Sequence, residues 1–329
     1  MASEREGQAL WYVGPGRAEL RAEPVAAPAP HEVRLRARYG AISRGTERLV
    51  FNGAVPPSEF ARMRGPNMAG DFPFPVKYGY AVVAEVEQGP PALTGRLVFA
   101  LHPAQDIFNL PADFLVPVPE QVPPARAVLA ANMETALNAL WDGAPAPADR
   151  IAVVGGGVIG MLVLRLCARL PGSEVTLIDI APARAEIAQA FGAKFAAPEA
   201  APKECDLVFH ASGSAAGLAT ALRIAGEEAT IVELSWYGTA EVAVPLGEAF
   251  HSRRLRLVSS QVGRVAASHR ARWTNARRLA AALDLLADPV LDRLLAPAVP
   301  FAELPSRLPQ ILGPQSDARC ALIRYPDAP

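Results

Sequence analysis

The second half of the chain alternates short apolar runs with segments of helical periodicity. Residues 151–154 form a β-branched run, and apolar residues at helical spacing follow from 158 to 170, where Pro171-Gly172 ends the helix. Residues 174–178 form a second apolar run. Further strands are predicted at 194–197, 206–210, 229–234 and 255–260, and helices at 181–191, 218–224 and 270–286. This rhythm predicts a parallel, doubly wound sheet, with the last helix on the surface.

The first 122 residues follow a strand-like pattern instead. Residues 32–39 alternate polar and apolar positions, and 81–87 and 96–100 are further apolar runs separated by Gly and Pro. Residues 72–75 and 117–124 are too rich in proline to lie inside a helix. The pattern predicts a small, irregular β-barrel.

Two further segments set the domain boundaries. Helical periodicity covers 123–141, and a Pro/Ala turn leads from it into the strand at 151. Residues 294–325 return to short strands and proline-rich turns like those at the start of the chain. We therefore expect an α/β protein of two domains, with residues 1–122 and 288–329 in the barrel and 123–287 in the doubly wound sheet.

A glycine motif separates the strand at 151–154 from its helix. Gly155, Gly157 and Gly160 give the spacing G-x-G-x-x-G. The first permits a tight turn, the second lets a diphosphate approach the backbone, and the third lets the helix pack close to the strand. The helix N-terminus, at Val158 and Ile159, presents free N–H groups to the phosphates. The motif, between a strand and a helix, predicts dinucleotide binding.

The choice of dinucleotide depends on charge. Asp179 ends the second strand, nineteen residues after Gly160, where a carboxylate accepts hydrogen bonds from the adenosine ribose. It would repel a 2′-phosphate, so NAD(H) is favoured. Arg184, five residues further on, suits either the 2′-phosphate of NADP(H) or the adenine. NADP(H) therefore remains the alternative.

Polar residues follow two later strands of the predicted sheet. Ser212-Gly213 follows the strand at 206–210, and Ser235–Tyr237 follows the strand at 229–234. Because ligands bind beyond the carboxyl ends of such strands, we place Ser212 and Gly213 at the cofactor. Trp236 and Tyr237 suit a binding role or the core equally. His210 ends a strand at the same edge, and a structural role is the favoured interpretation for it over a contact with the ribose.

Composition narrows the class of protein. The 329 residues carry a net charge of −1, which argues against nucleic acid and against an anionic membrane surface as partners. The three cysteines are far apart and odd in number, which suits a reducing compartment. The polar start and the lack of an apolar run of about 18 residues predict neither a signal peptide nor a membrane span. We expect a soluble, cytoplasmic protein.

Short motifs across the chain resemble those of the medium-chain dehydrogenase/reductase superfamily. Gly45-Thr46-Glu47 is similar to its G-T-D, Lys77–Ala81 stands where it has G-H-E before a strand, and Gly95–Val98 resembles its G-D-R-V. Thr135 falls where the superfamily has a threonine near the nicotinamide. The resemblance implies a GroES-like barrel joined to a Rossmann domain. Within it, the stretches I-S-R-G-T-E and M-E-T-A-L-N-A-L-W look most like the bacteriochlorophyllide dehydrogenase-like branch.

The zinc-ligand positions of that superfamily are changed in this chain. The resemblance puts Ser43 or Arg44, Tyr80 and Ala131 where zinc members have their ligands. None of these is a good ligand, since zinc in proteins takes Cys, His or carboxylate groups. A four-cysteine lobe for a structural zinc is also missing from the sequence. We therefore expect no metal.

Hydride transfer to a carbonyl then needs organic groups to manage the charge that develops on oxygen. By position within the resemblance, Arg44 is the candidate cation, Thr46 and Ser43 the candidate proton relay, and Tyr80 the candidate donor. Glu134 and Glu47 are the candidates for orienting these groups. A half-buried barrel tyrosine and an Arg44–Glu47 ion pair are the structural alternatives.

The resemblance implies a zinc-independent oxidoreductase that moves a hydride between nicotinamide and an alcohol or ketone, a small molecule bound in the interdomain cleft. The alternatives are an enone or quinone reductase of the same superfamily, and a dinucleotide-binding sensor without catalysis. Superfamily members commonly dimerise by continuing the Rossmann sheet, so we expect a homodimer through the strand at 255–260.

Overall fold

The computed structural model describes residues 5–313, 316 and 319–326. They form two compact units, one from 1–131 and 279–329 and one from 132–278. The divisions fall inside helices α3 (Ala130–Gly143) and α7 (Asn275–Leu285). The boundary expected after 122 lies eight residues before α3 begins, and the boundary expected after 287 lies two residues past the end of α7.

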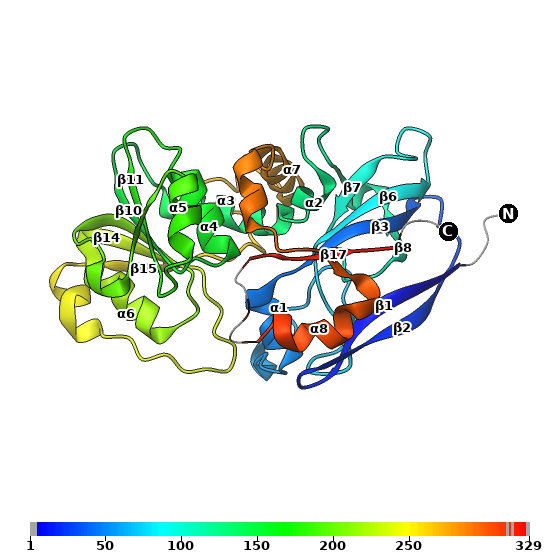
Figure 1. The fold of residues 1–329 in the computed structure, drawn as a ribbon, viewed down its shortest axis with the longest axis horizontal. Coiled ribbons are helices and arrows are strands. Elements are labelled where there is room, and N and C mark those ends of the chain that lie inside the picture. The colour runs from blue at the N-terminus through cyan, green and yellow to red at the C-terminus, as the bar shows by residue number, and fades with distance from the viewer. Residues whose placement is uncertain (1–4, 314–315, 317–318, 327–329) are drawn as a thin grey trace. The chain divides into compact units, whose positions relative to one another are not determined.

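Unit 1 contains two sheets, which are antiparallel except for the parallel pair of their last two strands, β16 and β17 (Figure 1). The smaller has the order β2-β1-β5-β4, and the larger has the order β16-β17-β3-β6-β7-β9 with β8 also paired to β3. The strands are β1 (Arg5–Gly14), β2 (Arg17–Val25), β3 (Glu32–Ile42), β4 (Ala69–Gly70), β5 (Val76–Lys77), β6 (Val82–Gln88), β7 (Leu97–Ala100), β8 (Ile107–Pro111), β9 (Val116–Pro117), β16 (Val299–Pro300) and β17 (Ala321–Arg324). Strand β17 runs antiparallel to β3, so the end of the chain completes a sheet that its beginning started.

Unit 1 also contains helices between its strands. These are α1 (Arg44–Phe51), α2 (Pro124–Ala127), α8 (Leu304–Ile311) and the 3₁₀ turns Pro57–Glu59, Ala112–Phe114, Pro289–Leu294 and Phe301–Glu303. The sequence pattern missed α8 because Pro305 and Pro309 read as turn residues. Pro305 occupies the first turn, where its absent N–H costs nothing, and Pro309 is tolerated inside the last turn.

Unit 2 is built on one six-stranded parallel sheet with the order β12-β11-β10-β13-β14-β15, which confirms the predicted doubly wound sheet. Its strands are β10 (Arg150–Val154), β11 (Glu174–Ile178), β12 (Lys194–Ala196), β13 (Cys205–His210), β14 (Ala225–Glu233) and β15 (Arg256–Ser259). Its helices are α4 (Val158–Cys167), α5 (Arg184–Ala190), α6 (Ala215–Ile224), the 3₁₀ turn Pro198–Ala200, the π-helix Leu246–Phe250 and the parts of α3 and α7 that lie in this unit.

Helix α7 begins later than its apolar pattern predicts. The Thr274 hydroxyl accepts a hydrogen bond from the Arg277 amide over 3.1 Å, which is an N-terminal cap, and the chain before it turns irregularly. The predicted helix over 123–141 is likewise two helices, α2 and α3, separated by Val128 and Leu129.

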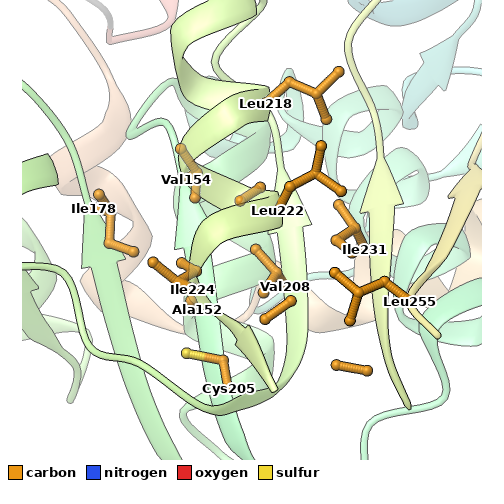
Figure 2. Close-up of a cluster of buried hydrophobic side chains, with 13 residues drawn as sticks. Ala152, Val154, Ile178, Cys205, Val208, Leu218, Leu222, Ile224, Ile231 and Leu255 are labelled. Atoms are coloured by element: carbon orange, nitrogen blue, oxygen red, sulfur yellow. The ribbon is translucent and has the colours of Figure 1, made fainter. Parts of the chain in front are cut away.

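One hydrophobic core cluster of unit 2 lies between helix α6 and the parallel sheet (Figure 2). Leu218 and Leu222 on α6 face Val208 of β13 and Ile231 of β14, and all four are almost fully buried. Continuous β-branched runs suit strands that are covered on both faces. This packing holds the carboxyl ends of β10, β13 and β14 in fixed positions. Among the described residues, no helix is long and apolar enough to cross a membrane.

Candidate dinucleotide site and a buried polar cluster

The turn after β10 can be made only by glycine at two of its positions. Gly155 has a φ of +105°, and a Cβ there would lie 2.6 Å from the backbone N and Cα of Ser212. A Cβ on Gly160 would lie 1.9 Å from the Gly155 carbonyl oxygen. A Cβ on Gly157 would meet nothing within 4 Å. Gly155 and Gly160 therefore close the turn, and Gly157 leaves open space above the backbone.

That open space lies at the start of helix α4. Gly157 is the N-terminal cap residue and has no side chain to satisfy the first amides, and Val158 and Ile159 begin the helix half-buried. Strand β10 is flanked by β11 on one side and β13 on the other, so the chain reverses its winding here. In doubly wound sheets this switch point is where ligands bind.

Asp179 lies beside the same turn. Its Oδ2 accepts a hydrogen bond from the Gly156 amide over 2.6 Å, and its Oδ1 accepts one from the Ala181 amide over 2.8 Å. Each oxygen keeps a second lone pair for another donor. Arg184 completes the group, since its Cγ would lie 3.3 Å from a Cβ built on Gly156. The structure thus brings together the glycine turn, the carboxylate and the cationic side chain that the sequence proposed.

This arrangement fits a dinucleotide. Amides at a helix start and open space above Gly157 suit a diphosphate, and a carboxylate with unused lone pairs suits a ribose diol. Gly155, Gly157, Val158, Ile159 and Gly160 would hold the diphosphate. Asp179 and Arg184 would face the adenosine side.

The turn after β13 packs directly against Gly155. The Ala211 amide donates to the Val154 carbonyl over 2.8 Å, which holds Ser212 next to the glycine turn. The Gly213 amide donates to Ser235 Oγ over 3.0 Å. Ser212 and Gly213 therefore lie at the predicted edge of the site.

His210 ends β13 without any exposure. Its Nδ1 lies 2.7 Å from Glu233 Oε2, and its Nε2 lies 2.6 Å from Ser212 Oγ. Burial pulls the pKa of Glu233 upward, but hydrogen bonds from His210 and Ser235 outweigh it and bring that pKa below its usual value. Sequence reasoning missed Glu233; the signal was a charged residue closing an apolar strand.

A second polar cluster lies inside unit 1, around Glu47. Glu47 is 1% exposed; the Tyr12 hydroxyl donates to its Oε2 over 2.6 Å and the Ser43 amide to its Oε1 over 2.7 Å. Burial raises the pKa of Glu47 to about 7, although the two hydrogen bonds act in the opposite direction. Tyr12 lies on β1 and was missed by sequence reasoning, because nothing local marks it as a partner of Glu47.

Tyr80 belongs to the same cluster. Burial and the nearby Glu47 raise the pKa of Tyr80 to about 12, while hydrogen bonds with the side chains of Ser43 and Thr46 lower it in part. Burial likewise raises the pKa of the Cys320 thiol to about 12, with a further contribution from Glu47. Tyr80, Ser43 and Thr46 are half-buried. The structure thus brings the two proposed relay residues, Ser43 and Thr46, into hydrogen-bonding contact with the proposed proton donor, Tyr80.

Arg44 begins helix α1, one residue after Ser43. One of its terminal nitrogens donates to the Gly313 carbonyl over 2.9 Å. The structural alternative for Arg44 was an ion pair with Glu47. The two carboxylate oxygens of Glu47 accept hydrogen bonds from the Tyr12 hydroxyl and the Ser43 amide.

Glu134, on α3, forms a buried ion pair with Arg278 of α7. The Arg278 Nε lies 3.0 Å from the Glu134 carboxylate, and both side chains are less than a tenth exposed. Arg278 also donates to Asn138 and to the Val262 and Arg264 carbonyls. The expected surface helix therefore carries a fully buried arginine, because the chain before α7 folds back over α3. Thr135, the next residue on α3, is half-buried.

The positions that correspond to zinc ligands hold the residues read from the sequence. They are Ser43 or Arg44, Tyr80 and Ala131, all in unit 1. Across residues 5–313, 316 and 319–326, no three His, Cys, Asp or Glu residues are grouped so as to hold a metal ion.

The chain was compared with family models and with known proteins, and the proteins it resembles are named as a dehydrogenase and a reductase. No family model matches the chain. It is 26% identical over 306 residues to a D-guloside 3-dehydrogenase of Escherichia coli, covering 84% of this chain and 87% of that protein. It is 25% identical over 172 residues to a probable D-xylulose reductase A of Aspergillus terreus, covering 46% of this chain and 48% of that protein.

Solved structures of similar fold cover almost the whole chain. An L-idonate 5-dehydrogenase of Escherichia coli superposes with a TM-score of 0.79 at 15% identity, covering 98% of this chain and 99% of that one. A Sinorhizobium meliloti protein described as a zinc-binding dehydrogenase, bound to NADP, gives 0.76 at 17% identity, covering 97% and 99%. A 2R,3R-butanediol dehydrogenase of Bacillus subtilis gives 0.74 at 15% identity, covering 98% and 100%.

The fold is that of alcohol dehydrogenases with a GroES-like and a Rossmann domain, which confirms the predicted fold class. With the sequence relatives, which are named as a dehydrogenase and a reductase, it indicates an oxidoreductase. The comparisons do not single out the zinc-lacking, bacteriochlorophyllide dehydrogenase-like branch.

Proposed function

We propose that this chain is a zinc-independent oxidoreductase that moves a hydride between a nicotinamide dinucleotide and an alcohol or ketone. The proposal rests on the glycine turn at Gly155–Gly160 with Asp179 beside it. The amides of the turn suit the diphosphate of an adenosine diphosphate group, and the Asp179 carboxylate suits its ribose. Similar folds bound to NADP and to NADH support the same cofactor class.

NAD(H) is the preferred cofactor. The Asp179 carboxylate faces the position of the adenosine ribose, and its charge opposes a 2′-phosphate. Arg184 lies beside the same turn and serves the adenine in this proposal. A preference for NADPH would instead assign Arg184 to the phosphate.

The residues at the zinc-ligand positions support the proposed independence from zinc. Serine, arginine, tyrosine and alanine stand at the ligand positions, and none of them is a good ligand for zinc. The bound nicotinamide supplies or accepts the hydride. The protein must then manage the proton and the charge on the substrate oxygen.

Tyr80 is the proton donor in this proposal. With a pKa of about 12 it stays protonated through the neutral range, so it is ready to donate to the oxygen of a ketone under reduction. The Ser43 and Thr46 side chains are hydrogen-bonded to it and carry the proton onward. Arg44, at the start of α1, supplies positive charge to the same oxygen.

Glu134 acts indirectly. Its carboxylate is committed to Arg278, so it holds helix α3 in place. Helix α3 also carries Thr135, which this proposal assigns to the nicotinamide. The named substrates of the sequence relatives, a guloside and xylulose, point to the secondary alcohols of sugars and polyols as the first class to assay.

The experiment is a titration followed by turnover. The purified chain should quench NADH fluorescence on binding, bind NADPH more weakly, and reduce or oxidise members of a panel of polyols, ketones, enones and quinones. Binding with no turnover on the whole panel would favour a dinucleotide sensor. Stoichiometric zinc by metal analysis, with activity lost on chelation, would overturn zinc independence.

The chain is proposed to act as a homodimer. Strand β15 closes one side of the parallel sheet and pairs with β14 alone among the described strands. Leu257 and Val258 on it are 38% and 39% exposed, which is high for residues of this size. A second copy that continues the sheet across this strand would cover both side chains.

A further inference from the structure

A buried imidazole lies behind the exposed turn 211–214 of unit 2. His210 and Glu233 are paired in register at the ends of the neighbouring strands β13 and β14. His210 is fully buried, and the Glu233 side chain is 13% exposed. Their contact of 2.7 Å joins Nδ1 to Oε2. Because the ionised carboxylate can only accept, the ring proton is on Nδ1.

The other ring nitrogen reaches the surface turn. His210 Nε2 lies 2.6 Å from Ser212 Oγ, so in the neutral ring it accepts the hydroxyl proton. Ser212 Oγ lies 2.9 Å from Ser214 Oγ and accepts from the Ser214 amide over 3.2 Å. A chain of hydrogen bonds thus runs from a buried carboxylate to two exposed hydroxyl groups.

Glu233 is itself held from a second loop. The Tyr237 hydroxyl donates to Oε2 over 3.1 Å and the Ser235 amide donates to Oε1 over 2.7 Å. Ser235 Oγ in turn accepts from the Gly213 amide over 3.0 Å. The loops after β13 and β14 are therefore locked together, with the His210–Glu233 pair at their centre.

The turn that this network holds forms one wall of the glycine turn. Only a glycine fits at 155, since a Cβ there would lie 2.6 Å from Ser212 N and Cα. The backbones at Ser212 and Gly155 are therefore closely packed, so a shift of Ser212 should also shift Gly155. Helix α6 leaves room for the network too, because a Cβ on Gly217 would lie 2.1 Å from Ser212 Oγ.

We propose that His210, held by Glu233, is a positioning residue for the dinucleotide. It fixes the Ser212 hydroxyl, and through it the wall beside Gly155, so that the glycine turn is already shaped for a diphosphate when the ligand arrives. Ser212 and Ser214 are both exposed, and we assign their hydroxyls to the same ligand. This inference rests on the proposed function and adds to it the residues that shape the site from behind.

The same atoms have the connectivity of a serine hydrolase triad, with Ser212 as nucleophile. Two amides argue against that use. The Gly213 amide is engaged by Ser235 Oγ and the Ser214 amide by Ser212 Oγ itself, so neither is available to stabilise an oxyanion. The geometry favours positioning.

Two substitutions of His210 each keep one of its two hydrogen bonds and remove the other. His210→Gln places its amide near the position of Nε2 and keeps the bond to Ser212, while His210→Asn places its amide near Nδ1 and keeps only the bond to Glu233. NADH binding is measured by fluorescence titration of the full chain, with thermal unfolding of each variant. We expect His210→Gln to stay within about threefold of the unaltered chain and His210→Asn to weaken NADH binding about tenfold or more.

Gly217→Ala is the second variant. It keeps the His210 side chain, but the added Cβ would lie 2.1 Å from Ser212 Oγ and 2.8 Å from His210 Nε2, so the bond between these two groups is disturbed. Alanine ordinarily stabilises a helix relative to glycine. We expect weaker NADH binding without a lower unfolding temperature. His102→Gln, at a buried histidine of unit 1, is the matched control and should leave NADH binding unchanged.

The outcomes are distinct. Equal NADH binding by both His210 variants and the unaltered chain overturns the inference, and so does equal loss in both with lowered unfolding temperatures, which marks a purely structural role. Labelling of Ser212 by a fluorophosphonate also overturns it, in favour of a nucleophile. If the unaltered chain binds neither NADH nor NADPH, the proposed function itself fails.

Discussion

The Tyr12 hydroxyl and the Glu47 carboxyl group are joined by a 2.6 Å hydrogen bond inside unit 1, 35 residues apart in the chain. The two lie on β1 and α1, and both are almost fully buried. Their burial makes a carboxyl group that titrates near neutral pH, which has measurable consequences.

Stability should fall between pH 4.5 and 7 because of Glu47. Its pKa is raised to about 7 in the folded chain from 4.5, so the folded state holds the proton more tightly. The contribution of Glu47 to the free energy of unfolding is fully present below pH 4.5 and is lost as the pH rises through 7. The loss is on the order of 3 kcal/mol. Glu47→Gln keeps a neutral amide that can accept from Ser43 and donate to the Tyr12 oxygen.

Denaturant unfolding at several pH values tests this. The Glu47→Gln chain should show a flatter pH dependence between pH 5 and 8 than the unaltered chain. Glu59→Gln, at a surface site, is the control. An unchanged slope in Glu47→Gln would mean that another group titrates in this window.

Tyr80→Phe should abolish most of the turnover. Removing the proton donor is expected to lower kcat about a hundredfold or more, while NADH binding is retained. Because the pKa of Tyr80 is about 12, ketone reduction should show no loss from Tyr80 ionisation below about pH 11. Tyr78→Phe removes a hydroxyl from the neighbouring ring, 6.1 Å away between centroids, and should be much milder. Equal effects of the two substitutions would remove the special role of Tyr80.

Arg278→Leu should destabilise the chain. It leaves the Glu134 carboxylate buried without its cation, which typically costs 3–5 kcal/mol, and it frees the Val262 and Arg264 carbonyls. Calorimetric unfolding should show a clear drop in melting temperature. Glu134→Gln, which keeps an acceptor for Arg278, should lose less stability and keep kcat within about fivefold. A hundredfold loss of kcat in that variant would instead assign Glu134 to the chemistry.

Asp179→Asn should reduce the preference for NADH over NADPH. The amide keeps an acceptor for the Gly156 amide but removes the charge that opposes a 2′-phosphate. We expect weaker NADH binding and stronger NADPH binding in paired titrations. The control is Asp206→Asn, at an exposed carboxylate on β13 that accepts from the Arg150 amide. A ratio of affinities unchanged by Asp179→Asn would separate this residue from the ribose.

Val258→Glu should convert the proposed dimer into a monomer. Two copies paired across β15 would bring like charges together at an edge that otherwise buries Leu257 and Val258. Sedimentation velocity measures the mass directly. Leu246→Glu, at a more exposed apolar residue that is not part of β15, should leave the mass unchanged. A monomeric unaltered chain would end the proposal.

The local sequence pattern alone was sufficient to predict the fold of the Rossmann unit. A strand, a glycine turn, a helix and a second strand ending on Asp179 lie within 29 consecutive residues, and each is set by near neighbours in the chain. The fold class and the dinucleotide turn therefore followed from the sequence.

The polar clusters were decided by tertiary structure. His210 meets Glu233 because two parallel strands end in register, Arg278 meets Glu134 across 144 residues, and Glu47 meets Tyr12 across 35. No local periodicity carries such pairings, because a buried charge finds its partner only when separate elements pack. The pKa of Glu47 and the polarity of the turn at Ser212 depend on that packing, since desolvation and hydrogen bonding act through space and not along the chain.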